Sequence, residues 1–140
     1  MSVLAILTGL LLAGVIGWRM CRRAGLPEAV AATAWGTGTD DGGGAAFLGL
    51  PPGGPAVVHF SAPWCGPCAA ARRVVEAVCD DLGVAHREVD IDANPAAARR
   101  FSVLSLPTTL IFDAEGRQRY RAAGVPTTAV LRSALEQLLA

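Results

Sequence analysis

The sequence contains no lysine and no excess of either charge, because 12 arginines balance 12 acidic side chains over its 140 residues. Proteins that bind nucleic acid place a surplus of cationic groups against the phosphates. Here no large basic block exists beyond Arg19, Arg22 and Arg23. The sequence also lacks the glycine motif of a nucleotide-binding loop. We therefore expect no nucleic-acid partner and no bound cofactor.

Cysteine is scarce, with four residues in all, and their placement excludes two common uses. A zinc site needs a further ligand cluster, but the sequence has no second CxxC pair and no group of histidines, so we predict no metal site. A disulfide framework is disfavoured because Cys21 lies in an N-terminal appendage and Cys79 in a predicted helix. Cys79 falls on the apolar stripe of that helix, which favours a core residue over an extra regulatory thiol. Cys65 and Cys68 remain as the one spaced pair.

This pair lies in residues 61–68, which read Ser-Ala-Pro-Trp-Cys-Gly-Pro-Cys between an apolar run and a helical pattern. At a helix start, unpaired N–H groups and the positive end of the dipole favour a thiolate at Cys65. A thiolate is the species that attacks disulfides. Cys68 lies one turn further along, close enough to form a disulfide with Cys65 and release a bound partner. Gly66 is expected to allow a tight turn, and Pro67 suits the first helical turn.

Residues 56–140 alternate between strand and helix patterns. The run at 56–60 is apolar on both faces, as in a central strand that is covered on both sides. Gly83 stops the helix that follows the cysteine pair, and Asn94 with Pro95 starts a second, short helix. The predicted order is a strand at 56–60, a helix that ends before 83, a strand at 86–92, a helix from 94 to about 101, strands at 108–112 and 118–122, and a helix from about 127.

The motif Trp64-Cys65-Gly66-Pro67-Cys68, with a strand before it and a helix after it, resembles the active site of the dithiol reductases of the thioredoxin family. The order β-α-β-α-β-β-α over residues 56–140 also resembles a thioredoxin core that lacks the extra N-terminal strand and helix. The resemblance implies an α/β, thioredoxin-like fold, with a mixed four-stranded sheet flanked by helices. It further implies a thiol-disulfide oxidoreductase that reduces protein disulfides and receives its electrons from a separate reductase.

A second motif of the resemblance is residues 105–109, which read Ser-Leu-Pro-Thr-Thr. In the family, a proline here is cis and faces the disulfide, whereas the alternative is an ordinary proline at a strand entry. With a cis Pro107, Leu106 would offer backbone groups to an extended substrate, and Gly124 would complete the groove. Trp64, Gly66 and Pro67 would form its other side.

His59 departs from the family pattern, because the reductases usually carry a buried aspartate at this position. That aspartate helps to accept the proton of the second cysteine. His59 lies on the central strand five residues before Trp64, so we expect it beneath Cys68. A neutral imidazole could accept the Cys68 proton. The alternative is a core histidine with one backbone hydrogen bond.

Before the domain, residues 3–18 form an uncharged apolar run of roughly 24 Å as a helix, a little short of the ~30 Å of a bilayer core, and the flanking residues extend it. We predict a transmembrane anchor over residues 1–20. A cleaved secretory signal is the alternative, but no basic residue precedes the run and its small-residue site is poor. Residues 21–55 are rich in glycine and proline and are predicted to be a flexible linker, with a reach of about 30 Å.

The arginines that follow the apolar run suggest its orientation. Because positive charge favours the cytoplasmic side, we predict a single-pass protein of a bacterial cell membrane whose domain lies in the cytoplasm. Its partners would be disulfide-containing proteins and the separate reductase. Two alternatives stay open. One is an extracytoplasmic oxidoreductase for envelope or cytochrome maturation, and the other is a non-enzymatic tethered adaptor that uses the thioredoxin fold.

Overall fold

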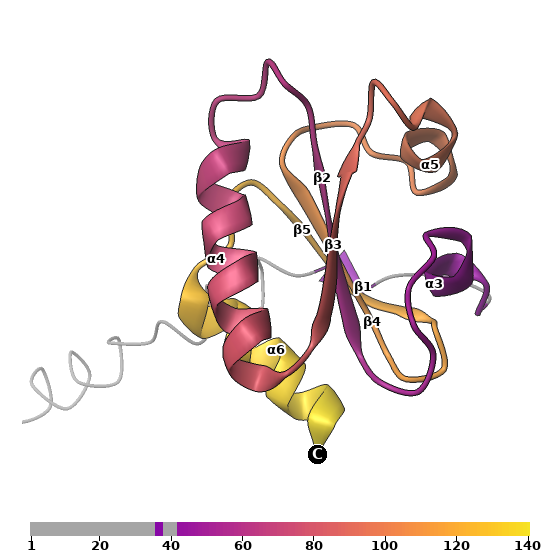
Figure 1. Ribbon diagram of the computed structural model, residues 1–140, viewed down its shortest axis with the longest axis vertical. Coiled ribbons are helices and arrows are strands. Elements are labelled where there is room, and N and C mark those ends of the chain that lie inside the picture. Colours follow the sequence, from indigo (N-terminus) through magenta and orange to yellow (C-terminus); the bar gives the residue numbers. More distant parts are fainter. Residues whose placement is uncertain (1–35, 38–41) are drawn as a thin grey trace, which may run out of the picture. The chain divides into compact units, whose positions relative to one another are not determined.

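A computed structural model of the chain describes residues 36–37 and 42–140, all of which belong to one unit that spans 33–140. Figure 1 shows the order of the elements along the chain. They are β1 (Gly36–Thr37), α3 (Gly44–Phe47), β2 (Ala56–Ser61), α4 (Cys68–Leu82), β3 (Ala85–Asp90), α5 (Pro95–Arg100), β4 (Thr108–Phe112), β5 (Gln118–Ala123) and α6 (Thr128–Leu139).

The strands form one mixed sheet in the order β1-β5-β4-β2-β3, in which β2 and β3 are parallel and the other pairs are antiparallel. The four predicted strands are all present. The fifth, β1, was not predicted: it pairs Gly36 with Arg121 and Thr37 with Tyr120 at the edge of the sheet. Two residues are too short for the period of two by which a strand is identified in a sequence.

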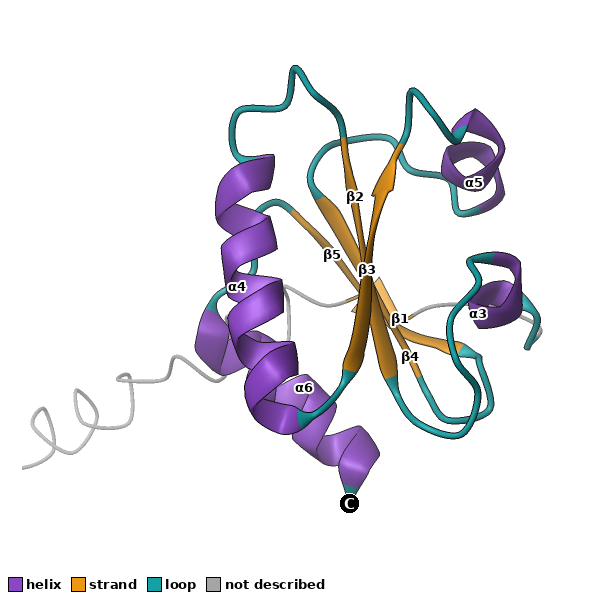
Figure 2. Cartoon of the chain, in the orientation of Figure 1, coloured by secondary structure: helices purple, strands orange, loops and turns teal. Residues whose placement is uncertain are grey.

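Helices cover both faces of the sheet, α4 and α6 on one side and α3 and α5 on the other (Figure 2). β2 is buried along its whole length, as its apolar composition predicted. Its side chains alternate between the two faces. Val57 packs in a cluster with Val75, Val78 and Leu131, whereas Val58 and Phe60 pack in a second cluster with Phe101. His59 therefore points to the α4 face, with Val57.

Within the predicted linker, the segment around α3 packs on the rest of the domain. Leu48 and Leu50 are buried in the same cluster as Phe60, and the Phe47 ring contacts the Phe101 ring edge-on at 6.2 Å. Arg87 Nη1 on β3 also donates a hydrogen bond of 2.8 Å to the Leu48 carbonyl. The folded domain thus begins before residue 56, in contrast to the prediction. A few apolar residues among glycines carry no periodic signal, and only the sheet face supplies their partners.

The described residues do not include the predicted anchor at 1–20, Cys21 or the linker before residue 36. Within the part of the chain that the structure describes, no helix has the length and apolar character needed to cross a bilayer.

Candidate active site

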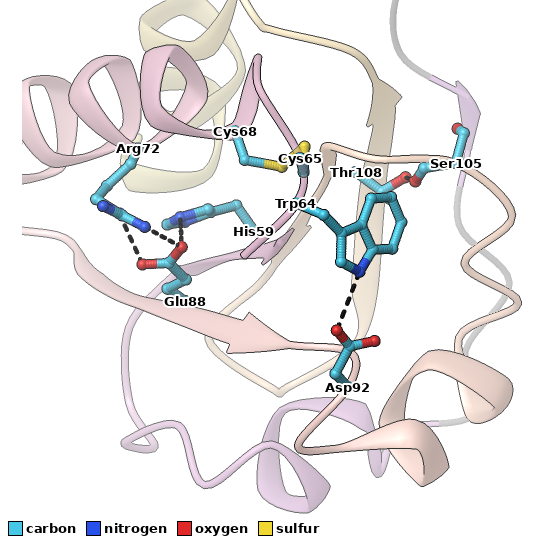
Figure 3. Close-up of a disulfide and its surroundings, with 9 residues drawn as sticks. All are labelled: His59, Trp64, Cys65, Cys68, Arg72, Glu88, Asp92, Ser105 and Thr108. Carbon is cyan, nitrogen blue, oxygen red and sulfur yellow. Dashed lines mark hydrogen bonds and ion pairs between the residues drawn. A yellow bond between two sulfur atoms is a disulfide. The ribbon is translucent and has the colours of Figure 1, made fainter. Parts of the chain in front are cut away.

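The cysteine pair joins the end of β2 to the start of α4, where Cys65 and Cys68 form a disulfide with their Cα atoms 5.5 Å apart (Figure 3). Cys65 is partly exposed, whereas Cys68 is 2% exposed. The turn is held by the Cys65 N–H, which donates to the Ala62 carbonyl at 3.0 Å, and by the Cys68 N–H, which donates to the Cys65 carbonyl at 3.3 Å. Of the two cysteines, Cys65 is therefore the one that a partner can reach more readily.

The two residues between the cysteines play different structural parts. Pro67 has helical backbone angles and precedes α4, and its carbonyl accepts the hydrogen bond of the Ala71 N–H at 3.2 Å. This confirms the predicted place of Pro67 at the helix start. Gly66 is not among the residues with positive φ, and a Cβ there would meet no atom within 4 Å. Gly66 was expected to allow a tight turn, and the backbone at this position does so without an angle that only glycine adopts.

The loop before β4 contains the predicted cis bond, between Leu106 and Pro107. Thr108 Oγ1 donates to the Ser105 carbonyl at 2.8 Å, and the Gly124 N–H donates to the Pro107 carbonyl at 2.8 Å. Gly124 has a φ of 84°, which side chains other than that of glycine rarely adopt. Leu106 is partly buried beside this proline. Position 124 thus needs glycine for its backbone, and it is tied directly to the proline loop.

Trp64 presents a large apolar surface beside the disulfide, with 68% of the residue exposed. Its indole Nε1 donates to Asp92 Oδ2 at 3.0 Å, as the dashed line in Figure 3 shows. Asp92 follows β3, and its own N–H donates to Asp90 Oδ1 at 2.8 Å. Asp92 was not predicted as a site residue, although it holds the indole in place.

His59 is 1% exposed, and neither ring nitrogen has a hydrogen-bond partner. His59 therefore lies in the core, as the alternative expected, but without the backbone hydrogen bond. Nε2 lies 3.6 Å from Glu88 Oε1, which is its nearest charged group of opposite sign in the described chain. Burial lowers the pKa of His59, and the negative charge of Glu88 opposes that effect. The imidazole is thus neutral near pH 7, with both nitrogens unused.

Glu88 and Arg72 form a two-pronged ion pair next to His59 (Figure 3). Arg72 Nε donates to Glu88 Oε2 at 2.7 Å, and Nη2 donates to Oε1 at 2.6 Å. These hydrogen bonds, above all other effects, lower the pKa of Glu88 to about 2. Arg72 lies four residues after Cys68, on the same side of α4. Sequence spacing could have found Arg72, whereas Glu88 needed the register of β2 with β3.

Cys79 is free and buried in the α4 and α6 cluster, which confirms its predicted place in the core. Burial, with a smaller effect from Asp80, raises the pKa of its thiol to about 12. This cysteine is therefore inert in comparison with the pair. Among the described residues, no three His, Cys, Asp or Glu side chains gather as a metal site would require.

An α/β fold that carries a CxxC disulfide at the start of a helix, with one cysteine partly exposed and the other buried, is the arrangement of a thiol-disulfide oxidoreductase. Comparisons with known proteins agree with this class. The thioredoxin family model matches residues 51–137. Thioredoxin of Mycolicibacterium smegmatis is 42% identical over 89 residues, which cover 61% of this chain and 79% of that protein.

Two further relatives extend the comparison. The bifunctional thioredoxin reductase/thioredoxin of Mycobacterium leprae is 38% identical over 81 residues, or 55% of this chain and 17% of that protein. The X-ray structure of Fasciola hepatica thioredoxin is similar, with a TM-score of 0.56 and 33% identity over 62% of this chain and 83% of that one. The chain belongs to the thioredoxin family, and it is a protein-disulfide oxidoreductase.

Proposed function

We propose that this chain reduces disulfide bonds of other proteins with the Cys65 and Cys68 dithiol, from a tether in a bacterial cell membrane. The observation that carries the proposal is the difference in exposure between the two cysteines of the disulfide. Cys65 is accessible to a partner, whereas Cys68 is 2% exposed and can reach only what is already bound to Cys65. This is the division of labour between an attacking and a resolving thiol.

The reaction runs in two exchanges. The Cys65 thiolate attacks a substrate disulfide, so that a Cys65–substrate bond forms and the first substrate sulfur leaves as a thiolate. Cys68 then loses its proton and attacks the Cys65 sulfur, which forms the internal disulfide and releases the second substrate thiolate. Two electrons pass from the dithiol to the substrate. His59 is the proposed acceptor of the Cys68 proton, because it is buried, neutral and has both ring nitrogens unpaired.

The substrate would bind across the surface that surrounds the disulfide. Trp64 offers an exposed aromatic face, held by Asp92. Leu106 would present its backbone to an extended segment of substrate, as in strand addition. Gly66, Pro67, Pro107 and Gly124 would complete this groove.

A second protein must return the internal disulfide to the dithiol. We expect a separate reductase, because the sequence has no nucleotide-binding glycine motif of its own. The name of the Mycobacterium leprae relative, bifunctional thioredoxin reductase/thioredoxin, supports such a pairing, since it joins both activities in one chain.

The apolar run at residues 3–18 and the arginines after it support a single span with the domain on the cytoplasmic side. Labelling of the exposed thiols in intact cells with a membrane-impermeant reagent tests this part of the proposal. The labels should reach Cys65 only after the membrane is opened. Labelling of Cys65 in intact cells would instead place the domain outside, in an envelope pathway.

The activity is tested by reduction of insulin disulfides with dithiothreitol as the electron source. We expect Cys65→Ser to abolish the catalysed reduction and Cys68→Ser to accumulate a mixed disulfide between Cys65 and insulin. Cys21→Ser is the control, because it also removes one thiol but lies far from the pair in sequence. A Cys65→Ser protein that reduces insulin as fast as the unaltered chain would overturn the proposed chemistry.

A further inference from the structure

Three buried polar atoms lack a hydrogen-bond partner among the described residues, namely His59 Nδ1, His59 Nε2 and Thr109 Oγ1. They lie side by side in the sheet. His59 is opposite Thr109 of β4 in the antiparallel register and opposite Glu88 of β3 in the parallel register. Directly paired residues of neighbouring strands point to the same face. Thr109, His59 and Glu88 therefore form one polar row on the α4 face of the sheet.

An unpaired buried polar atom costs about 1–3 kcal/mol, so a row with three of them calls for an explanation. Figure 3 shows Cys68 and, one turn later, Arg72, both on the start of α4, next to His59 and Glu88 of this row. Arg72 holds both oxygens of Glu88, and Oε1 also faces His59 Nε2 at 3.6 Å. The carboxylate is thus shared between an exposed cation and a buried, neutral base.

We propose that Glu88 is a positioning residue for the second exchange, in which its carboxylate orients the His59 ring and stabilises the imidazolium that forms when His59 takes the proton of Cys68. Arg72 holds the carboxylate in place and reduces its electrostatic attraction for the protonated ring. The inference rests on the proposed function, because it concerns the step in which Cys68 resolves the mixed disulfide. It assigns that step a second residue, on a strand that carries neither cysteine.

The charges around His59 fit this role. Glu88 on β3 and Glu76 on α4 favour the protonated ring, whereas Arg72 on α4 and His86 on β3 disfavour it. Glu88 has the largest of these charge effects, and burial opposes it. Without Glu88, only Glu76, which has the smallest of these charge effects, would still favour the protonated ring. His59 would then be a weaker base towards the thiol.

The proton and electron balance of the step is complete. As the Cys68 sulfur attacks Cys65, its proton passes to a ring nitrogen of His59, and the Cys65–substrate bond breaks. The substrate leaves as a thiolate. The imidazolium lies beside the ionised Glu88 and then gives its proton to solvent. Solvent is near because Glu88, at the end of the row, and its partner Arg72 are both partly exposed.

A simple charge effect would have the opposite sign. A carboxylate near Cys68 disfavours its thiolate, so if Glu88 were only a neighbouring charge, Glu88→Gln would favour deprotonation of Cys68 and speed its attack. If Glu88 acts through His59, the same substitution slows the attack. The direction of the change therefore decides between the two.

The test is stopped-flow reaction of the reduced full chain, in a Cys21→Ser background, with 5,5′-dithiobis(2-nitrobenzoate). The first nitrothiolate is released when Cys65 attacks, at a rate that depends on reagent concentration. The second is released when Cys68 resolves, at a rate that does not. We expect Glu88→Gln to slow the second phase roughly 3- to 10-fold and to leave the first within about twofold. Glu88→Asp should recover part of the loss.

Two controls sharpen the result. Asp81→Asn removes a carboxylate from a similar arginine pair at the far end of α4, with Arg132 Nη2 at 2.6 Å, and it should leave both phases unchanged. In a His59→Asn background, Glu88→Gln should add no further slowing. A second phase that is unchanged or faster in Glu88→Gln overturns the inference, as does equal slowing in the presence and absence of His59.

A separate readout follows the His59 ring by NMR titration and needs no substrate. We expect the pKa of His59 to fall in Glu88→Gln and to rise in Arg72→Gln, because their charges act on it in opposite directions. A His59 pKa that does not move in Glu88→Gln overturns the inference even if the protein reduces disulfides. If the unaltered chain shows no first nitrothiolate phase, the proposed function is wrong instead. The NMR titration would then still test whether Glu88 acts on the His59 ring.

Discussion

Replacement of Leu48 by alanine tests whether the segment around α3 belongs to the folded domain. Leu48 is 5% exposed and packs in the cluster that contains Phe60 and Phe101. Leucine-to-alanine changes in a core cost about 2–5 kcal/mol, from lost burial and from the cavity left behind. Because α3 is a single turn at the margin of the core and can relax, we expect a loss of about 2–3 kcal/mol. A leucine in a flexible tether would change the stability by less than about 0.5 kcal/mol.

The assay is urea denaturation of the full chain, followed by the fluorescence of the tryptophans, with thermal unfolding as a second measure. A loss of this size would lower the unfolding midpoint by roughly 10–20 °C for a domain of about 100 residues. Leu104→Ala is the matched control, because Leu104 is 95% exposed and its loss should leave the stability within about 0.5 kcal/mol. If Leu48→Ala has the same unfolding midpoint as the control, the packing of α3 on the sheet does not stabilise the protein and our prediction is wrong.

Three further predictions concern the backbone at Gly124, the pH dependence of stability and the reactivity of Cys79. Gly124→Ala should destabilise the protein by about 1–2 kcal/mol, because the φ of 84° is costly for alanine. The control is Gly54→Ala, at a position with open space and no positive φ. This control should unfold at nearly the same urea concentration as the unaltered protein. Burial lowers the pKa of His59 from its ordinary 6.5, so the unfolded chain binds the proton first and stability should fall as the pH drops below 6.5. The pKa of Glu88, lowered from 4.5 to about 2, should add a second loss as the pH falls through that window. Urea midpoints against pH would show both losses, and His59→Asn should remove the first alone. Cys79, whose buried thiol has a pKa raised to about 12, should resist iodoacetamide at pH 8 until the protein unfolds; mass spectrometry that finds it alkylated at the rate of Cys65 in the native, reduced protein would contradict its burial.

The fold could be predicted as far as its signals are local. The strand at 56–60, the helix after the cysteine pair and the stop at Gly83 each follow from a few neighbouring residues, and the structure has all three. β1 and α3 escaped prediction for the same reason. Gly36–Thr37 becomes a strand only because β5 supplies its partner, and Leu48 becomes a core residue only because the sheet face receives it.

In the site, too, local features could be predicted and features that depend on strand pairing could not. The sequence by itself determined the two cysteines and their order along the helix start, since these depend on spacing within one turn. The cis bond before Pro107 was expected only from the resemblance to the thioredoxin family, and the structure contains it. Tertiary structure alone decided that His59 faces Glu88 without a hydrogen bond. These two residues lie on different strands, and their meeting depends on the register of the parallel pair. A shift of one residue would turn Glu88 to the opposite face, because side chains alternate along a strand.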